Sequence, residues 1–227
     1  MLVNRQAPSM ALRLHGITFA DAHHEPTGDG TGTGSGTGTG SWSGTLLVPF
    51  RDLCAVVSEQ KIFAVDEATP ADVERHRSVV DWLFRRVSVL PAPVGVVFRG
   101  PDVLRRWLEL HYVSLTGALE FVDDRAVARV HVVRADGKPE DLESGSDLAA
   151  SATEAMRALR RLAVASVPLR HEEVTGLVLS SSFLVERDLW AGFMSALKEQ
   201  RDAHHLLRFD MTGPWAPYDF VQMQFGA

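Results

Sequence analysis

Hydrophobic residues concentrate in several short stretches of this chain, and these stretches predict β-strands. Such stretches span residues 11–20, 46–50, 53–58, 89–98, 125–133, 167–174 and 177–185, with a last one beginning near Leu206. In the stretch 125–133, alternate residues from Ala126 to Val132 are expected to face a core.

Four other stretches repeat their hydrophobic residues at helical spacing. They begin near Thr69 and near Gly100-Pro101, and at residues 148–163 and 188–203. The first has a clear start signal, because Thr69 can cap the helix, Pro70 suits its first turn and Asp72 stands at the capping-box position.

The order of these elements predicts an α+β protein of two small domains, each with an antiparallel sheet and packed helices. The polar, turn-rich residues 135–147 are the expected linker between an N-terminal domain, 1–134, and a C-terminal domain, 148–227. The C-terminal order of helix, two strands, helix and strand is most of a ferredoxin-like βαββαβ unit.

Composition narrows the function classes. The chain has 227 residues, 45% of them hydrophobic and 23% charged, with a net charge of -6. This acidic balance argues against a nucleic-acid partner. No hydrophobic run is long enough for a membrane span, and the start has no signal-peptide pattern, so we expect a cytoplasmic protein.

A tract rich in glycine and threonine, within residues 27–44, matches glycine-rich phosphate-loop patterns superficially. A phosphate loop needs a helix directly after it, whereas this tract leads into the strand-like stretch 46–50. We therefore expect a flexible loop between two strands.

Candidate catalytic and metal-binding residues do not form a recognisable constellation. The pairs His23-His24 and His204-His205 lack ligand spacing, and the run His171–Thr175 has threonine where the HExxH motif needs its second histidine. The serines 180–182 lie in a strand-like stretch rather than on a sharp turn. We expect no metal, no cofactor and no catalytic residues.

Several other residues could be functional or structural. His76 and His111 lie on hydrophobic helix faces, and Trp82 and Trp107 also fall on helices, so we expect all four in a core or a domain interface. Cys54, the single cysteine, is expected to be a small buried hydrophobic residue.

The closing segment, residues 212–221, combines two prolines, a glycine and aromatic residues in a short space. Prolines leave such a segment little conformational freedom, so we expect it to dock on the body of the protein. Trp215 and Tyr218 are expected to be wedged against the chain's own domains, and binding of a partner is the weaker alternative. The candidate structural or interface residues are Thr212, Gly213, Pro214, Trp215, Pro217, Tyr218 and Phe220.

Four segments together resemble the gas vesicle protein L/F family (GvpL/GvpF). They are residues 52–59, 73–80, 89–98 and 212–221, and the last, which resembles the family's closing TGPWPPYSFV, is the most specific. The chain departs from the family pattern at Pro93, Val94, Ala216 and Asp219.

The resemblance implies a non-enzymatic minor gas vesicle protein, located at gas vesicles, that acts in assembly. It implies as partners the small, hydrophobic major shell protein and other minor gas vesicle proteins. A ligand-sensing ferredoxin-like module and, less favoured, a small metal-dependent enzyme stay open as alternatives.

Overall fold

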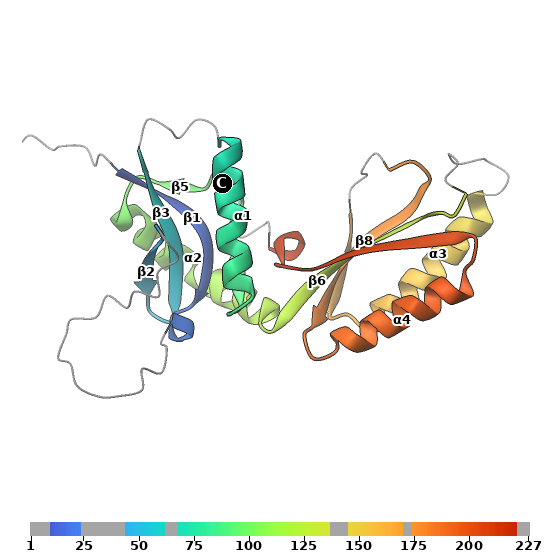
Figure 1. Cartoon of the computed structure of the whole chain (residues 1–227). Coiled ribbons are helices and arrows are strands. Elements are labelled where there is room, and N and C mark those ends of the chain that lie inside the picture. The colour runs from blue at the N-terminus through green and yellow to red at the C-terminus, as the bar shows by residue number, and fades with distance from the viewer. Residues whose placement is uncertain (1–9, 24–43, 62–67, 137–144, 170–173, 222–227) are drawn as a thin grey trace, which may run out of the picture. The chain divides into compact units, whose positions relative to one another are not determined.

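The computed structural model describes residues 10–23, 44–61, 68–136, 145–169 and 174–221. Its internal contacts divide the chain into two compact units. The first comprises Met1–Asp123 with Val221–Ala227, and the second comprises Asp124–Phe220. Both units combine helices with an antiparallel sheet, so the predicted α+β class with two sheets is confirmed (Figure 1).

The first unit is built on a five-stranded sheet with the order β2-β3-β1-β4, in which β5 also pairs with β1. Its pairings are all antiparallel. Its elements are β1 (Met10–Phe19), the short 3-10 helix η1 (Asp21–His23), β2 (Leu46–Phe50), β3 (Leu53–Lys61), α1 (Pro70–Phe84), β4 (Val89–Pro91), β5 (Val97–Phe98) and α2 (Pro101–Val122).

Helix α1 begins as its sequence predicts. The Thr69 hydroxyl accepts a hydrogen bond from the Asp72 amide, and the Thr69 amide donates to the Asp72 carboxylate at 3.0 Å. Both α1 and α2 pack on the sheet, and consecutive residues of β1 from Ala11 to Thr18 are buried. Successive residues of a strand point to opposite faces, so both faces of the sheet are covered at β1.

The second unit has the element order β-α-β-β-α-β and the strand order β7-β8-β6-β9. All three strand pairs are antiparallel, and β8 lies between β6 and β7, as in a split βαβ arrangement. Its elements are β6 (Arg125–Arg134), α3 (Gly145–Arg160), β7 (Ala165–Pro168), β8 (Leu177–Glu186), α4 (Trp190–Ala203), β9 (Leu207–Trp215) and the 3-10 helix η3 (Tyr218–Phe220).

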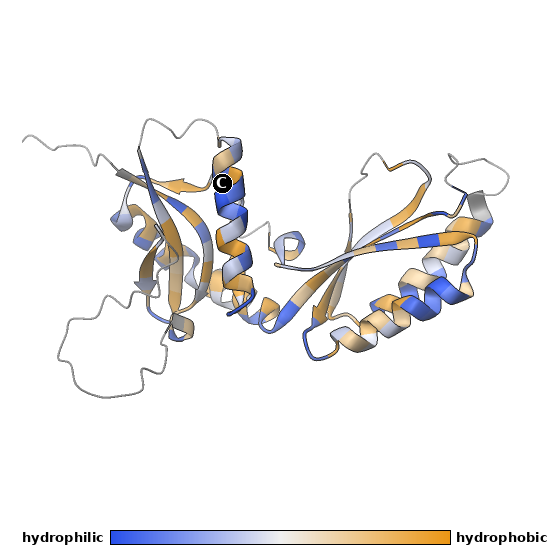
Figure 2. Cartoon of the chain, in the orientation of Figure 1, coloured by the Kyte–Doolittle hydropathy of each residue, from blue (hydrophilic) through white to orange (hydrophobic). Residues whose placement is uncertain are grey.

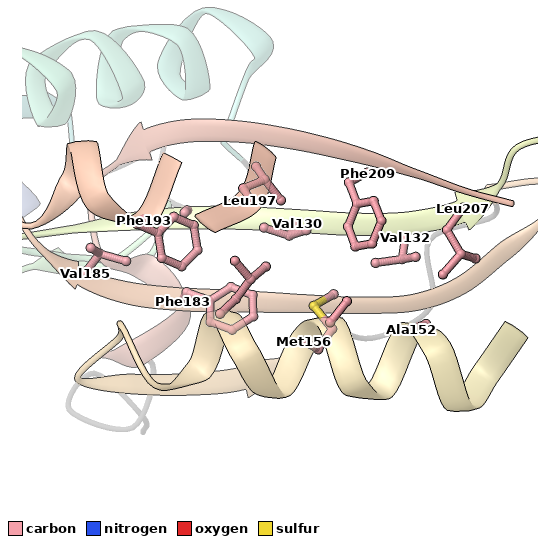
Figure 3. Packing of buried hydrophobic residues seen from close by; sticks show 13 residues of the cluster. Val130, Val132, Ala152, Met156, Phe183, Val185, Phe193, Leu197, Leu207 and Phe209 are labelled. Atoms are coloured by element: carbon pink, nitrogen blue, oxygen red, sulfur yellow. The ribbon is translucent and has the colours of Figure 1, made fainter. Parts of the chain in front are cut away.

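Helices α3 and α4 cover one face of this second sheet, and the core lies between them and the strands (Figures 1 and 3). The rings of Phe183 from β8 and Phe193 from α4 meet there at a centroid distance of 5.5 Å. The expected inward residues Ala128, Val130 and Val132 are part of this core. Most residues in the C-terminal half of α4 are hydrophilic (Figure 2).

The division between the units differs from the predicted linker at 135–147. Strand β6, which the sequence placed in the first domain, pairs with β8 and β9 and therefore belongs to the second unit. Helix α3 begins at Gly145, inside the predicted linker, and ends at Arg160 rather than Ala163. Residues 137–144, and residues 24–43 of the predicted loop, lie outside the described residues.

Candidate functional site

Helix α2 carries hydrophobic side chains on the side that faces solvent. Val103 is 51% exposed, Leu110 74%, Val113 82% and Phe121 39%. A helix turns by about 100° per residue, so these four positions fall within one narrow sector of α2. We call these four residues, with Gly117 between them, the outer face of α2.

The side of α2 that packs on the sheet is separate from this outer face. It consists of the buried residues Leu104, Leu108, Leu115, Leu119 and Val122. At about 100° per residue, the centres of the two faces point in nearly opposite directions. The hydrophobic residues of the outer face are therefore not needed for packing on the sheet, and an exposed hydrophobic patch of this kind is typical of an interaction site.

Gly117 makes the outer face accessible to a close approach. A Cβ atom added there would meet no heavy atom within 4 Å. A side chain of a partner could therefore approach the α2 backbone at this point.

Aromatic rings extend the surface beside the first half of the outer face. Trp107 stacks on His111 with ring centroids 4.8 Å apart, and Phe98 of β5 lies 5.4 Å from Trp107. Both Trp107 and His111 are half-buried rather than core residues, so the expectation that they lie in a core or interface is only partly met.

The closing segment consists of the end of a strand and a short 3-10 helix. Strand β9 continues through Gly213 and Pro214 to Trp215, and its register with β6 shifts between Val127 and Arg129. Residues Tyr218–Phe220 then form the 3-10 helix η3.

The structure places the predicted residues of this segment in two groups. Ala216 and Pro217 are buried and Tyr218 and Phe220 half-buried, whereas Thr212, Pro214 and Trp215 are exposed. The expectation that the Trp215 ring is wedged against the body is wrong, since 43% of the residue is exposed. Its Nε1–H donates to the Thr212 hydroxyl at 3.1 Å, within the same strand.

Asp219 anchors the segment to the second sheet. Its two carboxylate oxygens accept hydrogen bonds from Arg129 Nε and Nη2 at 2.9 and 2.8 Å. The fully buried Ser182 donates a third bond from its hydroxyl, at 2.6 Å.

A pair of buried histidines lies in the first unit. His15 of β1 and His76 of α1 are almost fully buried, and their Nδ1 atoms are 3.2 Å apart. His76 Nε2 lies 3.0 Å from the Ala92 carbonyl oxygen, and His15 Nε2 lies 2.9 Å from the Ser58 hydroxyl. His76 is thus a satisfied core residue, as predicted.

One set of proton positions satisfies every bond of this chain. A carbonyl only accepts, so His76 Nε2–H donates to Ala92, and a neutral His76 ring then accepts at Nδ1. His15 then donates from Nδ1–H to His76, and the Ser58 hydroxyl donates to His15 Nε2. This arrangement needs no charged ring.

The surroundings of the pair favour this neutral state. Burial, followed by the charges of His76, Arg75 and Arg13, lowers the pKa of His15 to about 3. Burial is also the main reason that the pKa of His76 is lowered to about 4. Such rings cannot serve as proton carriers near neutral pH, so we assign the pair a structural role.

The remaining chemical candidates are dispersed. Ser180 Oγ lies 3.0 Å from His131 Nδ1 across β8 and β6, both on sheet strands. Cys54 is buried, as predicted, and burial raises the pKa of its thiol to about 11. Over the described residues, no group of three or more His, Cys, Asp or Glu side chains is placed to hold a metal ion. Residues 24–25 and 171–173 of the candidate histidine clusters lie outside these residues.

Comparison with known proteins identifies the family. The model of the gas vesicle synthesis protein GvpL/GvpF family matches residues 14–146 and 141–222. The chain belongs to the GvpL/GvpF family.

Sequence relatives and solved structures agree with this assignment. The chain is 31% identical to gas vesicle protein F2 of Halobacterium salinarum over 188 residues, which cover 79% of this chain and 81% of that protein. It is 28% identical to gas vesicle protein F of Haloferax mediterranei over 189 residues, which cover 79% of this chain and 83% of that protein. The crystal structure of GvpF from Anabaena sp. PCC7120 superposes with a TM-score of 0.70 at 16% identity and covers 94% of this chain and 99% of that one.

In this GvpL/GvpF protein, sequence reasoning missed the outer face of α2 and the partner of His76. A signal for the first was present, because Val103, Leu110 and Val113 are hydrophobic residues off the buried stripe of α2. His15 lies among hydrophobic residues of a predicted strand, but its pairing with His76 depends on how α1 packs on β1. Among the helices of the described residues, none is both long and hydrophobic enough to cross a membrane.

Proposed function

We propose that this GvpL/GvpF protein acts in gas vesicle assembly by binding the major shell protein through the outer face of α2. Membership of the family supports a role in gas vesicles. The observation that carries the proposed binding is the exposure of Leu110 and Val113, at 74% and 82%, on a helix whose opposite side already packs on the sheet.

The hydrophobic character of the shell protein explains why an exposed hydrophobic helix face would bind it. A small, hydrophobic shell subunit must be shielded from aggregation before it is incorporated, and an exposed hydrophobic helix face can cover it. A helix of the shell subunit would lie along α2 and bury the two faces against each other, a mode common to helix-binding grooves and surfaces. The protein acts in this role without catalysis, at the gas vesicle, together with other minor gas vesicle proteins.

A second part of the proposal concerns the fold of the second unit and the role of the closing segment. We propose that it is a ferredoxin-like domain, which its element order and strand order support. The Asp219 anchor holds the closing segment on this domain, so we propose that the segment of this chain has a structural role rather than a binding role.

A binding titration with the purified major shell protein tests the proposal. The double variant Leu110→Gln/Val113→Gln removes the most exposed hydrophobic residues while keeping good helix formers. We expect its Kd to rise at least about tenfold, because each buried hydrophobic side chain contributes about 1.5–3 kcal/mol. Leu206→Gln is the matched control, since Leu206 is also 74% exposed but lies in the second unit.

The two variants distinguish the possible outcomes. Wild type and Leu206→Gln should bind alike, and all three proteins should melt at similar temperatures. Equal binding by the double variant, or equal weakening by Leu206→Gln, would overturn the assignment of the outer face. Absence of binding by the wild type would overturn the proposed partner.

A further inference from the structure

Strand β9 forms a long edge of the second sheet. In the order β7-β8-β6-β9 it is the last strand, with nine residues, whereas the opposite edge strand β7 has four. A long edge strand offers unpaired backbone groups to which another strand can add. The protein therefore needs a feature that controls what pairs with β9.

The direction of each backbone group of β9 follows from its register with β6. The Ala135 amide donates to the Leu206 carbonyl at 3.0 Å, and the pairs Val133–Arg208 and His131–Asp210 continue in the same register. Alternate residues of an antiparallel strand bond to opposite sides. Phe209 and Met211 therefore direct their amide and carbonyl groups away from β6, toward the outer edge of β9.

Arg201 occupies this outer edge. It lies in the last turn of α4, and its Nε and Nη2 donate to the Phe209 carbonyl at 3.1 and 2.8 Å. The Leu207 amide is also engaged, since it donates to the His204 carbonyl at 2.9 Å. At the far end of the strand, Pro214 has no amide proton and the register shifts, which also hinders continued pairing.

We propose that Arg201 closes the outer edge of β9 against a second copy of the chain. A strand added to this edge must bond to the Phe209 carbonyl. It would therefore have to displace the charged Arg201 guanidinium group, which donates two hydrogen bonds to that oxygen. The partner that fits best is β9 of another molecule, because two identical edges can pair antiparallel about a two-fold axis. This device is independent of the outer face of α2 and of the shell protein.

The test compares the wild type with Arg201→Met, which keeps much of the side-chain length but removes the donors. Arg157→Met is the control, because Arg157 is an exposed arginine in the last turn of α3 and carries the same charge. In analytical ultracentrifugation, we expect Arg201→Met to dimerise with a Kd at least about tenfold lower than that of the wild type. Arg157→Met should behave as the wild type does.

A second variant shows whether the association uses the edge. Adding Met211→Pro to Arg201→Met removes an outward amide without removing a bond to β6, so it should return the protein to the monomer. Dimers that persist in this double variant would overturn the proposal, as would identical sedimentation of Arg201→Met and wild type.

Hydrogen exchange of the wild type provides a measurement that requires no variant. The Phe209 and Met211 amides should exchange faster than those of Arg208 and Asp210, which bond to β6. Equal protection of all four amides in the wild-type protein would contradict the outward direction of the Phe209 and Met211 amides on which the proposal rests.

Discussion

Arg129 of β6 donates two hydrogen bonds to the carboxylate of Asp219 in the closing segment, from Nε at 2.9 Å and from Nη2 at 2.8 Å. The Asp219 side chain is only 11% exposed, and the buried Ser182 hydroxyl completes its coordination. The segment that carries the family signature is thus held by a largely buried, charged hydrogen-bond cluster rather than by its tryptophan.

Replacing this carboxylate should destabilise the second unit. In Asp219→Asn, Arg129 and Ser182 lose a charged acceptor, and hydrogen bonds to charged groups are worth about 1.5–3 kcal/mol each. We expect the free energy of unfolding to fall by about 2 kcal/mol in urea titrations. Asp210→Asn is the control: Asp210 pairs with Arg208 at the surface, where an ion pair contributes about 0–1 kcal/mol. If Asp219→Asn and Asp210→Asn lower the free energy of unfolding equally, the bonds of Asp219 contribute no more stability than a surface ion pair.

The buried histidine pair should make the first unit sensitive to acid. The folded chain holds the pKa of His15 at about 3 and that of His76 at about 4, whereas their ordinary value is 6.5. Below pH 6.5 the unfolded chain therefore binds more protons than the folded chain. The stability that the neutral pair contributes is complete above pH 6.5 and is lost as the pH falls toward the folded pKa values.

As the pH falls from 6.5 to about 5, each buried histidine should lower the free energy of unfolding by on the order of 2 kcal/mol. The measurement is the free energy of unfolding across this range for wild type and for His15→Gln/His76→Gln. The double variant should be less stable at pH 7 but should lose much less on acidification. The same dependence on pH in both proteins would contradict the assigned neutral pair.

Two glycines should respond to alanine with opposite signs. Gly213 has a φ of +134°, and a Cβ there would lie 2.5 Å from the Val127 carbonyl oxygen. Gly213→Ala should therefore destabilise the protein by more than about 1 kcal/mol. Gly117→Ala, in the exposed interior of α2, should stabilise it by about 0.5–1 kcal/mol. Thermal melting of the two variants checks both signs.

Local signals predicted most of the fold. Thr69, Pro70 and Asp72 mark the start of α1, and the observed cap uses the same atoms that the sequence pattern requires. Short hydrophobic stretches located the strands from β1 to β3 within a few residues. These features depend on neighbours in sequence, so the sequence alone is enough to find them.

Features that depend on distant contacts were missed or misplaced. The boundary between units was set too late because β6 looks like any other strand until its partners β8 and β9 are known. Trp215 was expected to be buried because prolines and aromatics suggest docking, yet the buried contacts belong to Asp219. The outer face of α2 went unrecognised because a hydrophobic residue on a helix is first assigned to its core.

Site-specific photo-crosslinking tests the central claim most directly. A photoreactive amino acid is introduced at position 110 on α2 and, in a second protein, at position 206, where the native leucine has the same 74% exposure. After irradiation with the major shell protein, mass spectrometry identifies the crosslinked peptides. The proposed function predicts crosslinks to the shell protein from position 110 and few from position 206. Crosslinks from position 206 alone, or from neither position, would contradict it.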